Sequence, residues 1–300
     1  MSHTMNMPSS PETILARALH GGGTGRYIGA LLMDAGRLTP EATESILKLQ
    51  KESGLRFGEA AIQLGLLSED DIQFALSRQF DYPYLIAGDT SISEEVIAAF
   101  KPFSASVERL RALRSQLMVR CLDPESGHRC LAIVSPQRGE GRSYLAANLA
   151  VVFSQLGERT LLIDADMRHS RQHELFRLGS QPGLSAVLAG RCDAASAICR
   201  VDSLLDLSIL PAGAIPPNPQ ELLNRPAFGQ VLDHAQAHYD VVLIDTPAHA
   251  AADAFVVAAR AGAAVAIGRR NHTATHRLVD LVSALQSGGA RVIGTVLNDF

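Results

Sequence analysis

One stretch of the sequence, residues 131–153, constrains the fold of this chain more than any other. It opens with an apolar run at 131–134, passes through a loop with two glycines, and ends in apolar residues at helical spacing. A strand, a glycine-rich loop and a helix in this order are typical of phosphate-binding sites, because the loop N–H groups and the helix N-terminus attract anions. The loop departs from the strict phosphate-loop pattern twice, with Pro136 in place of glycine and Arg142 in place of lysine. Taken alone, these residues fit a plain structural turn equally well.

The rest of the chain after residue 130 repeats this alternation of strand-like and helix-like segments. Strands that are apolar throughout are typical of a parallel sheet with helices on both faces. Acidic residues follow two of these strands, Asp164 and Asp166 after one and Asp245 after another. Because ligands bind at the carboxyl ends of parallel strands, we expect these acids and the loop at one edge of the sheet. The expected strands are 131–134, 160–163, 207–210, 241–244, 263–267 and 292–297.

The acidic strand ends indicate a site for a metal ion and a nucleotide. A carboxylate such as Asp245, beside a phosphate-binding loop, is the usual support for the hydration shell of Mg²⁺, with the Ser143 hydroxyl as a second ligand. Asp164 and Asp166 alternate along an extended segment, so one can face the metal while the other faces an incoming hydroxyl. The alternative is that one of this pair caps the following helix.

The composition narrows the class of protein. The chain has 300 residues, of which 47% are hydrophobic, and a net charge of −4, so it carries no basic field that favours a nucleic-acid partner. No apolar run approaches the ~20 residues that cross a bilayer, and the first residues lack the apolar core of a signal peptide. The four cysteines form no Cys-x-x-Cys pair. We therefore expect a reduced, cytoplasmic protein without a zinc site.

An internal repeat precedes the α/β part of the chain. Its two copies are related by one offset of 29 residues, and each predicts a short helix, a glycine turn and a longer, capped helix. Units this small must pack on each other to bury their apolar faces. The matched pairs are Gly29 and Gly58, Gly36 and Gly65, Leu47 and Leu76, and Gln50 and Gln79. We expect a disordered tail at 1–24, a helical tandem-repeat domain at 25–85, a linker at 86–102 and the α/β domain at 103–300.

The second copy of the repeat, with Arg56, Gly58 and Gly65, resembles the cyclic di-GMP-binding N-terminal domain of type II secretion and pilus ATPases. The first copy lacks the matching arginine, because Tyr27 stands at its place. The alternative is a helical docking module whose glycines serve turns. The resemblance implies that cyclic di-GMP binds at Gly29, Gly36, Arg56, Gly58 and Gly65.

The α/β part resembles the bacterial tyrosine kinases, a family in the ParA/MinD branch of the phosphate-loop proteins. The likeness covers about residues 103–300 and is nearest to the exopolysaccharide chain-length-determinant kinases, which carry the same N-terminal repeat. It implies a mostly parallel phosphate-loop sheet flanked by helices, preceded by a small all-α domain. The residues that carry it are Ile163-Asp164-Ala165-Asp166-Met167-Arg168, the segments 183–190, 210–213, 216–223 and 241–247, and Glu108-x-x-Arg111-x-x-Arg114.

This resemblance implies roles for the residues of the site. ATP and Mg²⁺ are the implied cofactors, with Ser143, Asp166 and Asp245 at the metal. Asp164 would accept the proton of a substrate tyrosine, and Arg142 would act on the transferred phosphate. The helix at 103–120 would join subunits into a homo-oligomer through Glu108, Arg111 and Arg114. The implied nucleotide-binding residues are Gly139, Glu140, Gly141, Arg142, Ser143, Tyr144 and Asn298.

The implied partner is a membrane-embedded polysaccharide chain-length regulator, which would activate the kinase and hold it at the inner membrane. Two departures bear on the activity. Arg142 is longer than lysine and planar, and the five tyrosines form no cluster at the end of the chain, where family kinases carry their phosphorylated tyrosines. Tyr82 and Tyr84 are substitutes. Two alternatives stay open: a MinD/ParA-like ATPase switch that phosphorylates no tyrosine, and an inactive scaffold that senses cyclic di-GMP.

Overall fold

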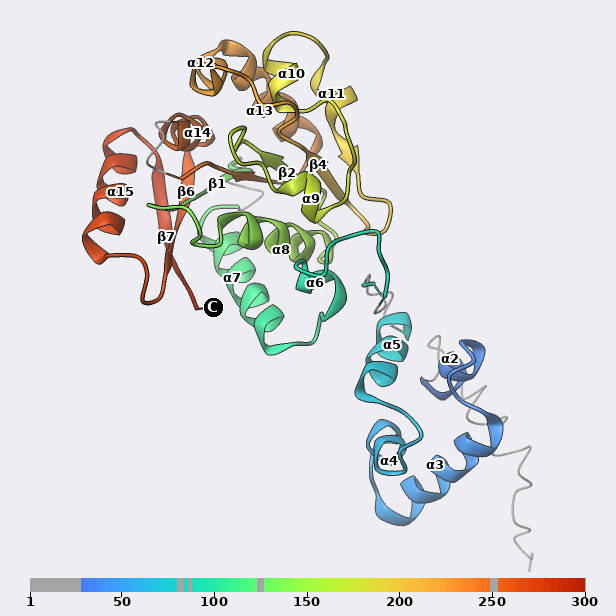
Figure 1. Ribbon diagram of the computed structural model, residues 1–300. Helices are drawn as coiled ribbons and strands as arrows, with labels where there is room; N and C mark the ends of the chain where they lie inside the picture. The colour runs from blue at the N-terminus through green and yellow to red at the C-terminus, as the bar shows by residue number, and fades with distance from the viewer. Residues whose placement is uncertain (1–27, 80–83, 86–87, 123–126, 249–252, 300) are drawn as a thin grey trace, which may run out of the picture. The chain divides into compact units, whose positions relative to one another are not determined.

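The structure is a computed structural model that describes residues 28–79, 84–85, 88–122, 127–248 and 253–299 (Figure 1). The chain forms two compact units, Met1–Pro83 and Tyr84–Phe300. The tail expected at 1–24 lies outside the described residues. Within these ranges, no helix has both the length and the apolar character that a bilayer crossing requires.

The N-terminal unit follows the predicted repeat. The longer helix of the first copy begins after Thr39, whose hydroxyl accepts the Ala42 N–H at 3.3 Å, and the matching helix of the second copy begins after Ser68, whose hydroxyl accepts the Asp71 N–H at 3.2 Å. The short helix of each copy ends at a left-handed glycine, Gly36 with φ 68° and Gly65 with φ 65°. The helices are α2 (Ile28–Asp34), α3 (Pro40–Ser53), α4 (Phe57–Gln63) and α5 (Glu69–Gln79).

The second unit is built on a seven-stranded sheet with the order β3-β4-β2-β5-β1-β6-β7 among the described residues. Every pair of neighbours is parallel except β3 and β4. The predicted fold class is confirmed, and each expected strand is present. Only the short edge strand β3 was missed, because two residues carry no readable period. The strands are β1 (Cys130–Val134), β2 (Thr160–Asp164), β3 (Cys199–Arg200), β4 (Leu207–Leu210), β5 (Val241–Asp245), β6 (Ala263–Arg269) and β7 (Arg291–Asn298).

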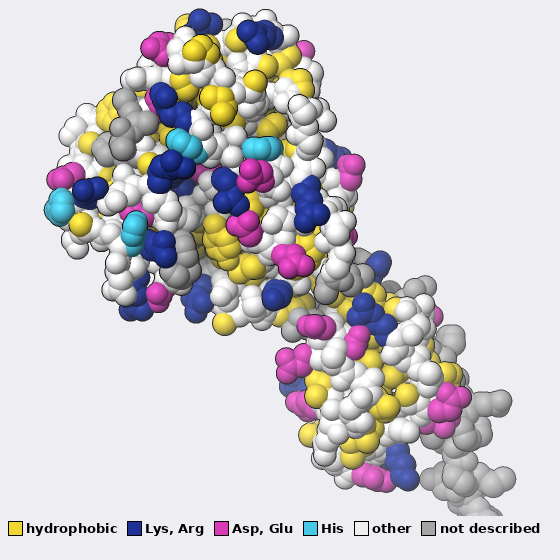
Figure 2. Space-filling view, in the orientation of Figure 1, with side chains coloured by type: hydrophobic (Ala, Val, Ile, Leu, Met, Phe, Trp, Pro, Cys, Tyr) yellow, Lys and Arg dark blue, Asp and Glu magenta, His cyan; other side chains and the backbone are white. Residues whose placement is uncertain are grey.

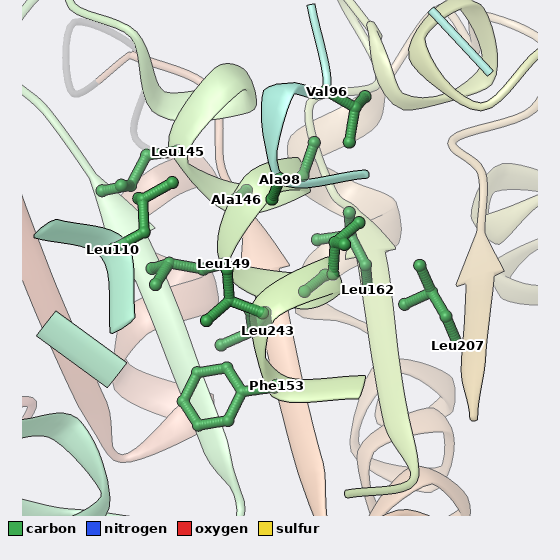
Figure 3. Packing of buried hydrophobic residues seen from close by; sticks show 14 of the residues in the cluster. Val96, Ala98, Leu110, Leu145, Ala146, Leu149, Phe153, Leu162, Leu207 and Leu243 are labelled. Atoms are coloured by element: carbon green, nitrogen blue, oxygen red, sulfur yellow. The ribbon is translucent and has the colours of Figure 1, made fainter. Parts of the chain in front are cut away.

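Helices cover both faces of this sheet, and alternate strand residues divide between two hydrophobic clusters. Leu131 and Ile133 pack with α6, α7 and α8, as Figure 3 shows for the neighbours Leu149, Phe153 and Leu243. Ala132 and other even-numbered residues of β1 pack with α10 and α12 to α15 on the opposite face. The helices are α6 (Ile97–Phe100), α7 (Ala105–Arg120), α8 (Arg142–Ser154), α9 (Gln172–Leu175), α10 (Leu184–Leu188), α11 (Ala194–Ala197), α12 (Pro219–Asn224), α13 (Pro226–His238), α14 (Asp253–Ala261) and α15 (Thr275–Ser287).

The segment 86–102 was expected as a linker, and its described residues, 88–102, belong to the second compact unit. Ile92 and Val96 are fully buried in the cluster around α8. The Ser93 N–H donates to the Leu175 carbonyl at 2.8 Å, and the Ala98 N–H donates to Asn148 Oδ1 at 2.9 Å. Sequence reading missed this packing because the apolar residues of the segment follow neither a helical nor a strand period.

Candidate active site

The candidate site lies where β1, β2 and β5 end side by side. β5 pairs with β1 on one side and with β2 on the other, and Asp164 and Asp245 are direct neighbours in the β2–β5 register. The loop 135–141 leaves β1 at this same edge and leads into α8. The parallel sheet thus brings the glycine loop and the two acidic strand ends together.

The loop depends on two glycines and on a buried carboxylate. Gly139 and Gly141 have φ values of 78° and 90°, which side chains rarely tolerate. The Glu140 side chain is fully buried. Its Oε2 accepts the Gln137 N–H at 2.7 Å, and its Oε1 accepts the hydroxyl of Thr273 in the turn after β6. Glu140 therefore supports the shape of the loop from inside, which is a different role from direct contact with a nucleotide.

Arg142, the first residue of α8, is buried and bonded to three parts of the site. Its Nε donates to the Thr246 carbonyl at 2.7 Å. Its Nη1 donates to the Gln137 carbonyl at 2.9 Å and to the Ser135 hydroxyl, and its Nη2 lies 3.8 Å from Asp166 Oδ2. The guanidinium thus joins the loop to the ends of β2 and β5, and it would exchange some of these acceptors to contact a phosphate.

Asp164 organises the turn that follows β2. Its Oδ1 accepts the Asp166 N–H at 3.1 Å, and its Oδ2 accepts the N–H groups of Arg171 and Gln172 at 3.1 and 3.0 Å. Burial, and next the charge of Asp245, raise the pKa of Asp164 well above its ordinary value. Asp164 therefore bonds to N–H groups at the start of α9, which is the capping role that sequence reading left open.

Asp166 lies in the same turn and is almost fully buried. Its Oδ1 accepts the N–H groups of Arg168 and His169 at 3.2 and 2.9 Å. Its other oxygen is the one near Arg142. The arginine and the carboxylate predicted to serve the phosphate and the metal therefore lie next to each other.

Asp245 has one oxygen bonded and one free. Its Oδ2 accepts the Gln172 side-chain amide at 2.8 Å, whereas Oδ1 is buried without a hydrogen-bond partner. Burial raises the pKa of Asp245, and the positive charge of Arg142 opposes that rise. The described residues hold no cluster of three His, Cys, Asp or Glu side chains that could ligate a metal. The unpaired Oδ1 of Asp245 fits a donor such as a water molecule of a hydrated cation, and Mg²⁺ usually keeps several of its waters.

Two residues far apart in the sequence reach the loop from the other side. Asn298, at the end of β7, donates its side-chain amide to the Glu140 carbonyl at 3.1 Å, and Arg269 donates to the Gly139 carbonyl at 3.2 Å. Tyr144 is half-buried, and burial, followed by the nearby Glu95, raises its pKa. Asn298 was predicted at this site, but the supporting contacts of Gln172 and Thr273 were not, since no sequence period marks them.

The residues predicted for oligomerisation divide between two environments. Glu108 and Arg111 form an ion pair three residues apart on α7. Arg114 is partly buried and donates to the Val152 carbonyl of α8 at 2.9 Å. The three side chains therefore do not form one outward-facing set, and Arg114 helps to hold α7 against α8.

The repeated glycines of the N-terminal unit have reasons within the fold. Gly36 and Gly65 end helices in the left-handed conformation. A Cβ atom on Gly29 would lie 3.3 Å from Phe57 Cζ, and one on Gly58 would lie 3.2 Å from Ile72 Cγ2, so both glycines allow close packing. The glycines alone therefore do not indicate a ligand.

Comparison with known proteins agrees with this architecture. A family profile described as an AAA domain matches residues 128–259. The tyrosine-protein kinase Wzc of Salmonella typhimurium is 35% identical over 205 residues, which are 68% of this chain and 28% of Wzc. The chain thus spans under a third of the length of that curated relative.

Two solved structures extend the comparison. The kinase domain of the Escherichia coli tyrosine kinase ETK superposes with a TM-score of 0.65 at 31% identity, over 68% of this chain and 79% of that domain. The cell division ATPase MinD of Pyrococcus furiosus gives a TM-score of 0.51 at 23% identity, over 57% of this chain and 71% of MinD, and shares the fold. Since the chain covers most of the ETK kinase domain at this identity, it belongs to the family of bacterial tyrosine-protein kinases.

Proposed function

We propose that this chain is a protein-tyrosine kinase that transfers the terminal phosphoryl group of ATP to a tyrosine hydroxyl. The observation that carries the proposal is the pairing of Asp164 and Asp245 at the ends of adjacent strands, beside a loop with two left-handed glycines. In phosphoryl transfer, positioning and charge neutralisation supply most of the acceleration. Both need the kind of preorganised, buried polar edge that is found here.

Each residue of this edge has a proposed part in the reaction. The N–H groups of the loop, with Ser143 and Arg142, bind the phosphates of ATP. Ser143 and Asp166, with Asp245 through water, would hold Mg²⁺, which would neutralise charge on the phosphates. Asp164 accepts the proton of the tyrosine hydroxyl or orients it.

A phosphorylation assay tests this proposal against its alternatives. The full chain is incubated with ATP, Mg²⁺ and a tyrosine-containing peptide, and phosphotyrosine and released phosphate are both measured. The kinase gives phosphotyrosine, which Asp166→Asn abolishes. Phosphate release without phosphotyrosine on the peptide or the chain contradicts the kinase and favours the MinD/ParA-like switch. Neither signal, with a dinucleotide still bound, favours an inactive scaffold.

The partner of this kinase is proposed from the family resemblance. A membrane-embedded regulator of polysaccharide chain length would activate it, and copies of the chain would associate through α7. The exposed carboxylate of Glu108, which is ion-paired with the partly buried Arg111, supports the second statement, whereas Arg114 bonds to α8 of its own subunit. Adding the regulator's cytosolic segment to the assay should raise phosphotyrosine, and Glu108→Ala should lower the oligomer mass seen by light scattering.

The N-terminal unit is proposed to bind cyclic di-GMP and so to gate the kinase. The Arg56 side chain is exposed at the start of α4, and apolar side chains reach the surface of this unit, among them Ile62, Leu64 and Leu66 at about 40% exposure (Figure 2). An exposed arginine and exposed apolar side chains on one small unit suit a phosphate and a flat base. Calorimetry with the full chain should detect binding that Arg56→Ala weakens at least tenfold and that Lys51→Ala leaves unchanged. Equal affinity in all three proteins would contradict this proposal.

A further inference from the structure

The side chain of Gln172 is a buried part of the site that no sequence pattern singled out. Gln172 is the first residue of α9 and is fully buried. Its Nε2 donates to Asp245 Oδ2 at 2.8 Å and to the Ser143 carbonyl at 3.1 Å. Both partners accept hydrogen bonds, so the nitrogen of the amide must face them, and its oxygen must point elsewhere.

The amide oxygen of Gln172 is itself unpaired. Gln172 Oε1 and Asp245 Oδ1 are both buried atoms without a hydrogen-bond partner. Buried polar atoms are rarely left unpaired in proteins, because such an atom loses its hydrogen bonds to water and gains none in the folded protein. Two unpaired oxygens on side chains that are hydrogen-bonded to each other indicate that a donor from outside the protein completes the site.

The backbone of Gln172 is fixed as firmly as its side chain. Its N–H donates to Asp164 Oδ2 at 3.0 Å, beside the N–H of Arg171 on the same oxygen. Asp164 therefore sets the position from which the amide reaches across to β5 and α8. This chain of contacts joins the two acidic strand ends through one side chain.

We propose that Gln172 is a positioning residue of the cation site. Its NH₂ group fixes Asp245 and the start of α8, and its free oxygen accepts a hydrogen bond from a water molecule of the hydrated divalent cation. The inference rests on the proposed function, because that function supplies the cation with its nucleotide. Its distinctive consequence concerns Mg²⁺-dependent binding, which can be measured without any phosphoryl transfer.

The test measures the affinity of a fluorescent ADP analogue for the full chain, once with Mg²⁺ and once with EDTA. The wild-type chain binds more tightly with Mg²⁺. Gln172→Met has a similar length but neither donor nor acceptor, and it should reduce the gain from Mg²⁺ about tenfold, as is typical for residues that orient metal ligands. The affinity in EDTA should change less than twofold.

A second variant and a matched control separate positioning from folding. Gln172→Asn keeps the amide but is too short to reach both partners, and it should also lose the gain from Mg²⁺. The matched control is Gln155→Met, at the end of α8 away from the site. It removes an amide that donates to the Ala98 carbonyl at 3.0 Å, and this variant should keep the full gain in affinity from Mg²⁺. Thermal melting in EDTA confirms that each variant is folded.

The possible results point in different directions. A full gain from Mg²⁺ in both Gln172 variants overturns the inference. An equal loss of affinity with Mg²⁺ and with EDTA also overturns it, because Gln172 would then shape the loop alone. If the wild-type chain itself shows no gain from Mg²⁺, the proposed function fails, and the assignment of Gln172 fails with it.

Discussion

At the scale of single residues, Arg142 decides how this loop differs from the usual phosphate loop. A lysine ammonium is compact and can reach a phosphate as a point charge, whereas a guanidinium is a planar fork that holds several acceptors at once. Here the fork spans Gln137, Ser135 and Thr246. The arginine is therefore a candidate phosphate ligand, and its hydrogen bonds also stabilise the conformation of the loop.

These two roles of Arg142 predict separable effects. Arg142→Ala leaves the buried Thr246 carbonyl without its donor and should lower stability by about 1–3 kcal/mol, and it should also weaken ATP binding and turnover. Arg142→Lys should recover turnover more than stability, since an ammonium cannot span all three acceptors. Turnover assays and chemical denaturation check this. Wild-type ATP affinity and turnover in the alanine variant would contradict the assignment.

The residues of the site differ in how far sequence could predict them. Asp164 and Asp245 each follow a continuous apolar run. The run predicts a buried strand, and the acid after it marks the carboxyl end of that strand. Gln172 and Thr273 carry no such signal, because each meets its partner, Asp245 or Glu140, only through tertiary contacts between segments far apart in the sequence. The inward bond of Arg114 was also hidden, since helical spacing alone does not say which neighbour a helix face meets.

At the scale of elements, the predictable strands are those buried on both faces. β1, β2 and β5 lie in the centre of the sheet, are buried along their whole length and have apolar interiors, which made them predictable. The short elements β3, α6 and α9 are set by tertiary contacts instead. α6 and the residues before it depend on Asn148, a buried polar side chain in the middle of α8.

Asn148 should therefore be a strong determinant of stability. Its Oδ1 accepts the Ala98 N–H at 2.9 Å, and its Nδ2 donates to the Glu95 and Tyr144 carbonyls at 3.2 and 2.9 Å. Asn148→Leu strands these groups and should cost about 2–3 kcal/mol in denaturant unfolding. Asn224→Ala, which changes an exposed residue of α12, should cost under about 0.5 kcal/mol. Equal midpoints for the two variants would show that Asn148 does not tie α8 to the preceding segment.

The starts of β2 and β5 are joined by an ion pair whose contribution should depend on pH. Arg159 donates to Asp240 at 2.9 and 2.7 Å, and these bonds lower the pKa of the Asp240 carboxyl. Because the pKa of Asp240 is lower in the folded state, its ionised carboxylate stabilises the folded protein at pH values above the unfolded pKa of about 3.9. This stabilisation is lost as the pH falls through the folded-state pKa. Because the pair is exposed, Asp240→Asn should cost under about 1 kcal/mol at pH 7.

Urea unfolding of both proteins at a series of pH values checks this dependence. The difference between wild type and Asp240→Asn should be constant from neutral pH down to about pH 5 and should shrink below about pH 4. A difference that persists unchanged into the acid range would mean that packing, not the ionised pair, accounts for it.

At the scale of the whole molecule, the boundary between the two units is a matter of burial. The chain divides after Pro83, and the 19 residues that follow up to the expected domain start at 103 belong to the second unit. The Leu85 N–H bonds the Ala99 carbonyl at 2.7 Å, and Ile92 and Val96 lie in the core beside α8. Composition suggested a spacer here, whereas the core of the second unit is incomplete without these residues.

Truncation at the two boundaries tests this directly. A fragment of residues 84–300 should fold cooperatively and bind nucleotide, because it keeps the whole core. A fragment of residues 103–300 loses Leu85, Ile92 and Val96, each of which stabilises by about 1.5–3 kcal/mol when buried, and it uncovers the surface of α8. The sum approaches the total stability of about 5–15 kcal/mol of an ordinary domain, so this fragment should be partly unfolded or aggregated at 25 °C. Circular dichroism melting distinguishes the two fragments. Equal melting temperatures would show that residues 86–102 do not stabilise the second unit and act as a spacer.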